Sequence, residues 1–163
     1  MNPRISLTKI NPKAYATVLA MQKYVDESGL EPLLLELIKL RASQINGCAY
    51  CLDMHTKDAR ALGETEQRLY TVSAWREAPF FSERERAALA LTEAITLVNK
   101  GHVADDVYAQ AHARFNDNEL VDLVMAIATI NTWNRLAITF RAEPGHYHPT
   151  ERVKQRAASA AQE

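Results

Sequence analysis

Residues 32–55 read PLLLELIKLRASQINGCAYCLDMH, and this stretch decides the fold. Pro32 suits the first turn of a helix, where its missing N–H is not needed, and the run that follows it is apolar on most sides. We therefore expect a helix over roughly 32–45 that is buried on several faces, by its own domain or by a partner subunit. Gly47 breaks the chain, and the pattern predicts a further helix from about Cys48 to Leu62.

The sequence on either side of this stretch also carries helical signals. Asn11 and Pro12 form a capping pair that opens a helix ending near Gly29. Two capping boxes open later helices, Ser82–Glu85 a helix that ends at Gly101 and Asn116–Glu119 a helix that runs through Trp133 towards Phe140. A short helix is expected over about 65–75 and an amphipathic one around Val107–Phe115. No segment alternates with a period of two, so the sequence predicts an all-α helical bundle.

Length and charge narrow the classes of protein that fit. A chain of 163 residues is one ordinary domain, which we expect to span residues 1–148, followed by a polar tail over 149–163 that is flexible or bound to a partner. The formal net charge of −1 argues against nucleic-acid binding, which needs a basic excess. The longest apolar stretch, Leu120–Ile130, contains Asp122 and is too short to cross a membrane. The N-terminus has no signal-peptide pattern, so we expect a cytoplasmic protein.

The residues that point to chemistry follow the pattern E-x11-C-x2-C-x3-H, from Glu36 through Cys48 and Cys51 to His55. Cys51 and His55 are four residues apart and share one face of the expected helix, at whose N-terminal end Cys48 lies. The partial positive charge of a helix N-terminus and a nearby imidazole both lower the pKa of a thiol. Because the thiolate is the nucleophile, the pattern predicts a reactive cysteine with a resolving partner.

Glu36 is an acid within an apolar run. If it is buried, we expect a raised pKa and a role in passing protons, through a water molecule. The alternatives are that Glu36 reaches the helix surface or pairs with Arg41 or another base, that His55 is a surface histidine, and that the two cysteines are inert thiols of the core.

A zinc site is the main chemical competitor. The two cysteines and His55 offer three ligands, and the fourth would have to be His102, His112, His146 or His148. No further cysteine exists, so the usual second half of a structural zinc site is missing, and we expect no metal. A thioredoxin fold is disfavoured because both flanks of the C-x-x-C pattern are helical.

The stretch LLLELIKLRASQINGCAYCLDMHTKDARALGETEQRLY, residues 33–70, closely resembles the core of the alkyl hydroperoxidase D (AhpD)-like branch of the carboxymuconolactone decarboxylase family. The similarity is strongest over residues 31–97 and continues through IATINTWNRL at residues 127–136. The resemblance implies an all-α, AhpD-like fold that assembles as a homo-oligomer, a trimer or a hexamer.

The same resemblance assigns roles to the four residues. Cys51 matches the peroxidatic cysteine, which becomes a sulfenic acid. Cys48 matches the partner that protonates the leaving alkoxide and then closes the disulfide, and Glu36 and His55 match the proton relay. One departure is that the best-studied members have a histidine between the two cysteines, where this chain has Ala49 and Tyr50. The relay is then shorter, or Tyr50 substitutes in part.

The function that follows is a thiol-dependent alkyl hydroperoxide reductase, an antioxidant enzyme. The resemblance implies a hydroperoxide substrate and a dithiol reductant, a lipoyl-bearing or thioredoxin-like protein, with no metal, haem or flavin. Two alternatives stay open. One is a redox-sensing or interaction protein that the same disulfide switches, and the other is a decarboxylase or lyase that works on the same fold without either cysteine.

Overall fold

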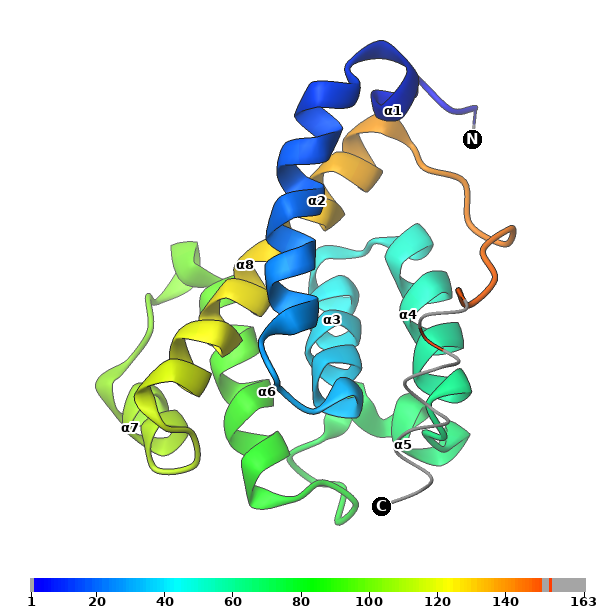
Figure 1. The fold of residues 1–163 in the computed structure, drawn as a ribbon. Coiled ribbons are helices and arrows are strands. Elements are labelled where there is room, and N and C mark those ends of the chain that lie inside the picture. The colour runs from blue at the N-terminus through cyan, green and yellow to red at the C-terminus, as the bar shows by residue number, and fades with distance from the viewer. Residues whose placement is uncertain (1, 151–152, 154–163) are drawn as a thin grey trace.

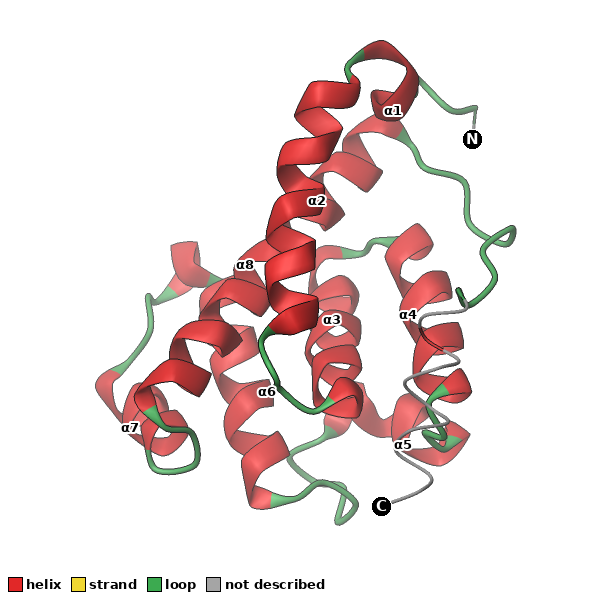
Figure 2. Cartoon of the chain, in the orientation of Figure 1, coloured by secondary structure: helices red, strands yellow, loops and turns green. Residues whose placement is uncertain are grey.

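Helices follow one another without a strand throughout residues 2–150 and 153, which are the residues that the computed structural model describes (Figures 1 and 2). The α-helices are α1 (Leu7–Ile10), α2 (Pro12–Glu27), α3 (Pro32–Asn46), α4 (Ala49–Ala61), α5 (Glu66–Thr71), α6 (Glu83–Thr96), α7 (Asp105–His112) and α8 (Asp117–Phe140). Two short 3₁₀-helices are η1 (Val72–Ala74) and η2 (Val98–Lys100). The all-α prediction is confirmed. Most of the tail expected over 149–163 lies outside the described residues.

The predicted caps form where the sequence placed them. The Asn11 side chain accepts the backbone N–H of Ala14 at 3.0 Å, and Pro12 is the first residue of α2. Both capping boxes, Ser82–Glu85 and Asn116–Glu119, are complete, with side chain and backbone bonded in each direction. Local sequence therefore sets the starts of three helices.

Two helices differ from the prediction in extent. The helix expected to reach Gly101 ends at Thr96, because Leu97 leaves the helical conformation at φ −101° and ψ 27° and η2 follows. The helix expected over 65–75 is shorter as an α-helix, since α5 ends at Thr71 and η1 continues the segment.

Helix α3 lies at the centre and packs against α4, α6 and α8. Nine of its residues are buried within the single chain: Leu34, Leu35, Glu36, Leu37, Ile38, Lys39, Leu40, Ala42 and Ser43. Its leucines belong to both hydrophobic clusters, Leu34 and Leu35 to the one that includes α8, and Leu37 and Leu40 to the one beneath α4 and α5. Of the two expected ways of covering this helix, its own domain or a partner subunit, the structure shows the first.

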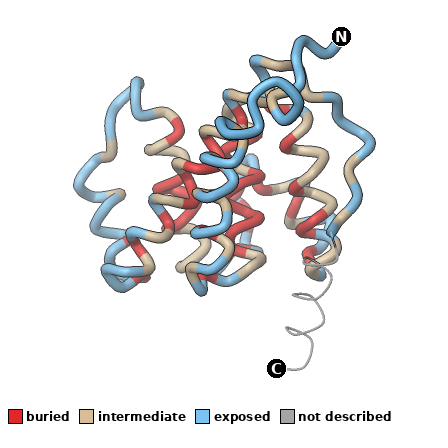
Figure 3. Tube along the Cα trace, turned by 45° about the horizontal axis from the view of Figure 1, so that its top comes forward, coloured by how far each residue is buried: buried red, intermediate tan, exposed pale blue. Residues whose placement is uncertain are grey.

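The first three turns of α2 and the C-terminal half of α8 form an arm that projects beyond the body of the bundle (Figure 1). The rings of Tyr15 and Trp133 join the two helices, with centroids 5.5 Å apart. The arm is much more exposed than the body, as Figure 3 shows for α2, whose only buried residue is Val25.

Among the described helices, none combines the length and apolar character that a membrane span requires.

Candidate functional site

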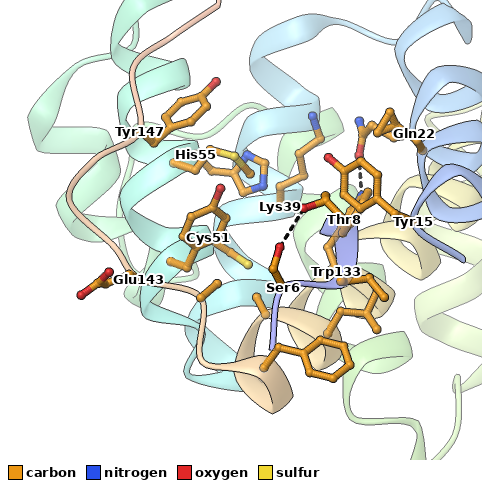
Figure 4. A pocket seen from close by; sticks show the side chains of 18 of the residues that line it. Ser6, Thr8, Tyr15, Gln22, Lys39, Cys51, His55, Trp133, Glu143 and Tyr147 are labelled. Atoms are coloured by element: carbon orange, nitrogen blue, oxygen red, sulfur yellow. Dashed lines mark hydrogen bonds between the residues drawn. The ribbon is translucent and has the colours of Figure 1, made fainter. Parts of the chain in front are cut away.

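A cavity of about 860 Å³ lies where the arm meets the body. Helices α3 and α4 form one side, and the N-terminal segment and the residues that follow α8 form the other. The inner wall comes from α3 and α4, and the arm adds aromatic and aliphatic side chains, among them Tyr15, Trp133 and Phe140 (Figure 4). The N-terminal segment from Pro3 to Thr8 and the segment after α8 complete the wall. Three of the four residues singled out by the sequence, Glu36, Cys51 and His55, line this cavity.

Cys48 and Cys51 meet at the start of α4. Cys48 is the N-cap residue, and its Sγ accepts the backbone N–H of Cys51 at 3.4 Å. Both are free cysteines and each is only 1% exposed, yet Cys51 is among the described residues that line the cavity and Cys48 is not. A molecule in the cavity therefore meets Cys51 first, with Cys48 behind it.

The two thiols are hydrogen-bonded and share one ionisation. The hydrogen bond from the Cys51 thiol, aided by backbone N–H donors and opposed by burial, lowers the pKa of Cys48 to about 7. The same hydrogen bond, together with burial, raises the pKa of Cys51. The resemblance makes Cys51 the peroxidatic cysteine, yet the thiol whose pKa is lowered is that of Cys48. The charge favours Cys48 because the N-cap position gives its sulfur the backbone donors.

A buried amide network behind the cysteines was missed by the sequence analysis. Asn134 of α8 hydrogen-bonds to both thiols and donates to Ser43 Oγ at 3.0 Å, and Ser43 also bonds to Cys51. Asn46 donates to the Oδ1 atoms of Asn134 at 2.8 Å and Asn131 at 2.9 Å. Asparagines that recur inside the apolar helix α8 are the signal that could have identified Asn134. The partners of Asn134, however, are about ninety positions away in the chain.

Glu36 and His55 also come together, as the relay implied by the family resemblance requires. His55 Nδ1 lies 2.7 Å from Glu36 Oε2, and both residues are buried, so His55 is not a surface histidine. The other carboxylate oxygen, Oε1, accepts from Lys39 Nζ at 2.8 Å. Arg41, named as a possible partner, binds Glu93 instead. Lys39 was missed, although an acid and a base three positions apart in an apolar helix are a readable pair.

The protonation state of Glu36 differs from the expectation. Burial favours the neutral acid, but the charges and hydrogen bonds of Lys39 and His55 outweigh it and lower the pKa of Glu36 from 4.5 to about 2. Glu36 is therefore a fixed anion at neutral pH that holds and orients the His55 ring. It is not itself a proton carrier.

Asp58 and Tyr147 extend the buried cluster and were also missed. Asp58 lies one turn after His55 on α4 and is 7% exposed. The Tyr147 hydroxyl donates to both of its carboxylate oxygens, at 2.8 Å and 3.0 Å. Burial raises the pKa of Asp58, although the hydrogen bond from Tyr147 acts in the opposite direction.

The arrangement speaks against zinc at the cysteines. Within the described residues, the one close group of three ligand-type side chains is Glu36, His55 and Asp58, whose donor atoms lie within 4.8 Å of one another. Neither cysteine belongs to it, nor do the four histidines considered as a fourth ligand. The Lys39 ammonium lies 2.8 Å from Glu36 Oε1 and already pairs with the charge of that carboxylate.

Tyr50, which occupies the place of the family's histidine, lines the cavity beside Cys51. Burial and the neighbouring cysteines raise the pKa of its hydroxyl, so it is a neutral phenol at physiological pH. It can donate a hydrogen bond into the cavity, but it cannot carry the charge that a histidine can.

Comparisons with known proteins agree with this architecture. The family model of the carboxymuconolactone decarboxylase family matches residues 12–94. YdfG of Bacillus subtilis, an uncharacterized protein, is 46% identical over 138 residues, which cover 85% of this chain and 94% of that protein.

Two solved structures show how far the likeness extends. A protein of unknown function from Agrobacterium tumefaciens, described as a candidate AhpD antioxidant defence protein, superposes with a TM-score of 0.85 at 44% identity, covering 91% of this chain and 99% of that one. The debrominase Bmp8 has a TM-score of 0.72 at 17% identity, covering 91% of this chain and 77% of that one, and shares the fold alone. A fold that also carries a debrominase does not by itself select a reaction. The match to the family model and the likeness to both close relatives show that the chain belongs to the carboxymuconolactone decarboxylase family, within its AhpD-like group.

Proposed function

We propose that the protein is a thiol-dependent hydroperoxide reductase in which Cys51 attacks the peroxide and Cys48 resolves the product. The observation that carries the proposal is the placement of the two cysteines. Cys51 lines a cavity of about 860 Å³, and the thiol of Cys48, which does not line the cavity, is hydrogen-bonded to the thiol of Cys51. Members of this family are enzymes, and the peroxidase chemistry is our assignment for this chain.

The first step uses the hydrogen bond between the thiols. The Cys48 thiolate accepts the proton of the Cys51 thiol as the Cys51 sulfur attacks the terminal oxygen of the hydroperoxide ROOH, the one that carries the hydrogen. The O–O bond breaks, Cys51 becomes a sulfenic acid, and the alkoxide RO⁻ takes the proton from Cys48 to leave as the alcohol ROH. Cys48 thus acts as the acid–base partner and regains its negative charge.

The second step closes the disulfide. The Cys48 thiolate attacks the Cys51 sulfenic acid, the S–O bond breaks, and hydroxide leaves. Each sulfur has then lost one electron, and the peroxide has gained two. Because the pair starts with a single proton, one more proton is needed to release the hydroxide as water. We assign its delivery to His55, whose Nδ1 is held by the Glu36 carboxylate so that Nε2 is left to exchange the proton.

The burial of the pair favours one kind of reductant. Both cysteines are almost fully buried, and within the part of the chain that the structure describes, Cys51 is reached through the cavity. A slender dithiol such as a lipoyl group can enter a cavity, whereas the broad active-site face of a thioredoxin-like protein needs an exposed disulfide. We therefore favour a lipoyl-bearing donor over a thioredoxin-like one. The cycle needs surroundings that return the cysteines to the dithiol form, and we assign it to the cytoplasm.

A donor screen tests the function. Consumption of cumene hydroperoxide is followed with dihydrolipoamide, with a thioredoxin system and with a glutaredoxin system, each with the parent protein and with Cys51→Ser. We expect many equivalents of peroxide to be consumed per subunit with dihydrolipoamide, and none above the background rate in Cys51→Ser.

The alternatives predict different outcomes in the same assay. A redox sensor forms the disulfide once and stops after one equivalent of peroxide per subunit, with every donor. A decarboxylase or lyase consumes no peroxide and keeps its activity in Cys51→Ser. No reaction of the parent with peroxide would contradict the proposal.

A further inference from the structure

Residues 142–150, which we call the strap, follow α8 and form part of the described cavity wall, together with their neighbours Arg141 and Val153. The strap contains no helix and runs back along α4 (Figure 1). A segment without backbone pairing of its own is held by the bonds that it makes to its neighbours. The strap bonds to three side chains of α4, one turn apart or less.

The strap has two outer anchors and one inner anchor. Asp53 accepts the backbone N–H of Gly145 at 2.9 Å, and Lys57 Nζ donates to the carbonyl oxygen of Tyr147 at 3.0 Å. These outer bonds are partly exposed to solvent, where water competes with them. The inner anchor is the bond from the Tyr147 hydroxyl to Asp58, which is buried beside His55. A bond to a buried carboxylate is the stronger kind, so Tyr147 contributes most to the position of the strap.

The strap forms one side of the cavity. Ala142, Glu143, Tyr147 and Thr150 line it, opposite the aromatic and aliphatic residues of the arm. Figure 4 shows Tyr147 beside His55, with Tyr15 and Trp133 across the cavity. Only a molecule with a sizeable organic group can touch both walls at once, and a small peroxide that reaches Cys51 touches the inner wall alone.

We propose that Tyr147 is a specificity-determining residue which, by fastening the strap to Asp58, builds the wall that holds the organic group of a bulky aryl or alkyl hydroperoxide. The inference rests on the proposed function, since it names the substrate class of the same site. It adds that selectivity for bulky over small hydroperoxides depends on a residue that does not touch the reacting sulfur.

The test compares Tyr147→Phe with Tyr24→Phe. The first variant keeps the ring and removes the hydroxyl that bonds to Asp58. The second removes a hydrogen bond between the same two residue types, 2.6 Å long, from Tyr24 to Asp122 on the exposed surface outside the cavity. The readout is kcat/KM for cumene hydroperoxide divided by kcat/KM for tert-butyl hydroperoxide. We expect this ratio to fall about tenfold in Tyr147→Phe, mainly through a higher KM for cumene hydroperoxide, which is the effect of about one hydrogen bond.

A binding measurement separates the inference from the function. The affinity for 2-phenyl-2-propanol, the alcohol product of cumene hydroperoxide, is measured by calorimetry and needs no turnover. We expect its Kd to rise about tenfold in Tyr147→Phe and to stay at the parent value in Tyr24→Phe. Failure of the parent to consume either peroxide would refute the proposed function, while the binding arm would still test the strap. An unchanged Kd and an unchanged ratio in Tyr147→Phe, or an equal loss in Tyr24→Phe, would overturn the inference.

Discussion

Cys48 and Cys51 divide between them the two properties that a peroxide-reducing thiol needs, since Cys48 has the lowered pKa and Cys51 lines the cavity. The pattern E-x11-C-x2-C-x3-H placed Cys51 and His55 on one helix face, and the resemblance to the family implied that Glu36 and His55 form one proton relay, in which the two are in contact. It did not predict where the charge lies. The charge lies on Cys48 because the Cys51 thiol and the backbone N–H groups at the start of α4 lower its pKa. Glu36 stays charged because Lys39 and His55 lower its pKa.

The rate of peroxide-driven disulfide formation should follow the ionisation of Cys48. With its pKa at about 7, the pair is neutral below this pH and carries one negative charge above it. At a fixed concentration of cumene hydroperoxide we expect the rate to rise about tenfold per pH unit below pH 7 and to level off above it. Cys48→Ser cannot form the disulfide, and its rate of sulfenic acid formation on Cys51 should lack this inflection. A rate that is independent of pH between about pH 5 and pH 9 would show that the thiolate does not limit the reaction.

Glu36→Gln should slow peroxide reduction and also lower stability. The amide cannot hold the His55 ring as the anion does, so His55 loses its place as the acid–base group, a loss that typically costs about 10²–10⁴-fold in rate. The substitution also leaves the buried Lys39 charge unpaired, at a cost of about 3–5 kcal/mol. The double variant Glu36→Gln with Lys39→Met, compared in urea unfolding, should recover most of that stability but not the rate. A parent-like rate in Glu36→Gln would mean that the carboxylate is only structural.

The stability effect of Glu36 should depend on pH in a defined direction. Its pKa is lower in the folded protein than in the unfolded chain, so the carboxylate stabilises the fold above pH 4.5, and this contribution is lost as the pH falls towards 2. The difference in stability between the parent and Glu36→Gln should shrink over that range.

At the scale of the elements, local signals predicted where helices begin better than where they end. Asn11 with Pro12, the box at Ser82 and the box at Asn116 each start a helix as expected, because a cap needs only residues within one turn. The end of α6 at Thr96 has no comparable signal, since Gly101 lies beyond a further 3₁₀ turn.

Gly47 is the element-scale feature that places Cys48 at the N-cap of α4. It ends α3 in the left-handed conformation at φ 70°, and a Cβ at this position would meet no atom within 4 Å. Gly47→Ala should therefore cost only the conformational penalty, about 1 kcal/mol in urea unfolding, and Gly47→Asn should cost less. A loss of several kcal/mol in Gly47→Ala would point to a contact that this geometry does not contain.

At the scale of the whole molecule, the sequence predicted the all-α fold but not the closure of the cavity. Its wall brings together residues that are far apart in the sequence. One example is the hydrogen bond of 2.8 Å from the Tyr147 hydroxyl to Asp58, 89 positions away in the chain. No periodic pattern reports a contact of that kind. Composition alone predicted that α3 is buried, but it did not say which elements cover it. Three other α-helices of the same chain do so.

The assembly stays a prediction, and its basis moves from α3 to the arm. Apolar side chains of the arm are exposed in the single chain, among them Leu19 at 41% and Ile138 at 45%. Exposed apolar surface of this kind favours association. We expect light scattering at micromolar concentration to give the mass of a trimer or hexamer, and Ile138→Glu to reduce it. A mass of 18.3 kDa for the parent would contradict the prediction.

The division of roles between the two cysteines is tested most directly by trapping the sulfenic acid. Cys48→Ser and Cys51→Ser are each treated with one equivalent of cumene hydroperoxide in the presence of dimedone, and the adduct is located by peptide mass spectrometry. The account predicts an adduct on Cys51 in Cys48→Ser, with no intramolecular disulfide, and no adduct in Cys51→Ser. An adduct on Cys48 in Cys51→Ser together with none on Cys51 in Cys48→Ser would contradict it, because the attacking thiol would then be the one that lies behind the cavity wall.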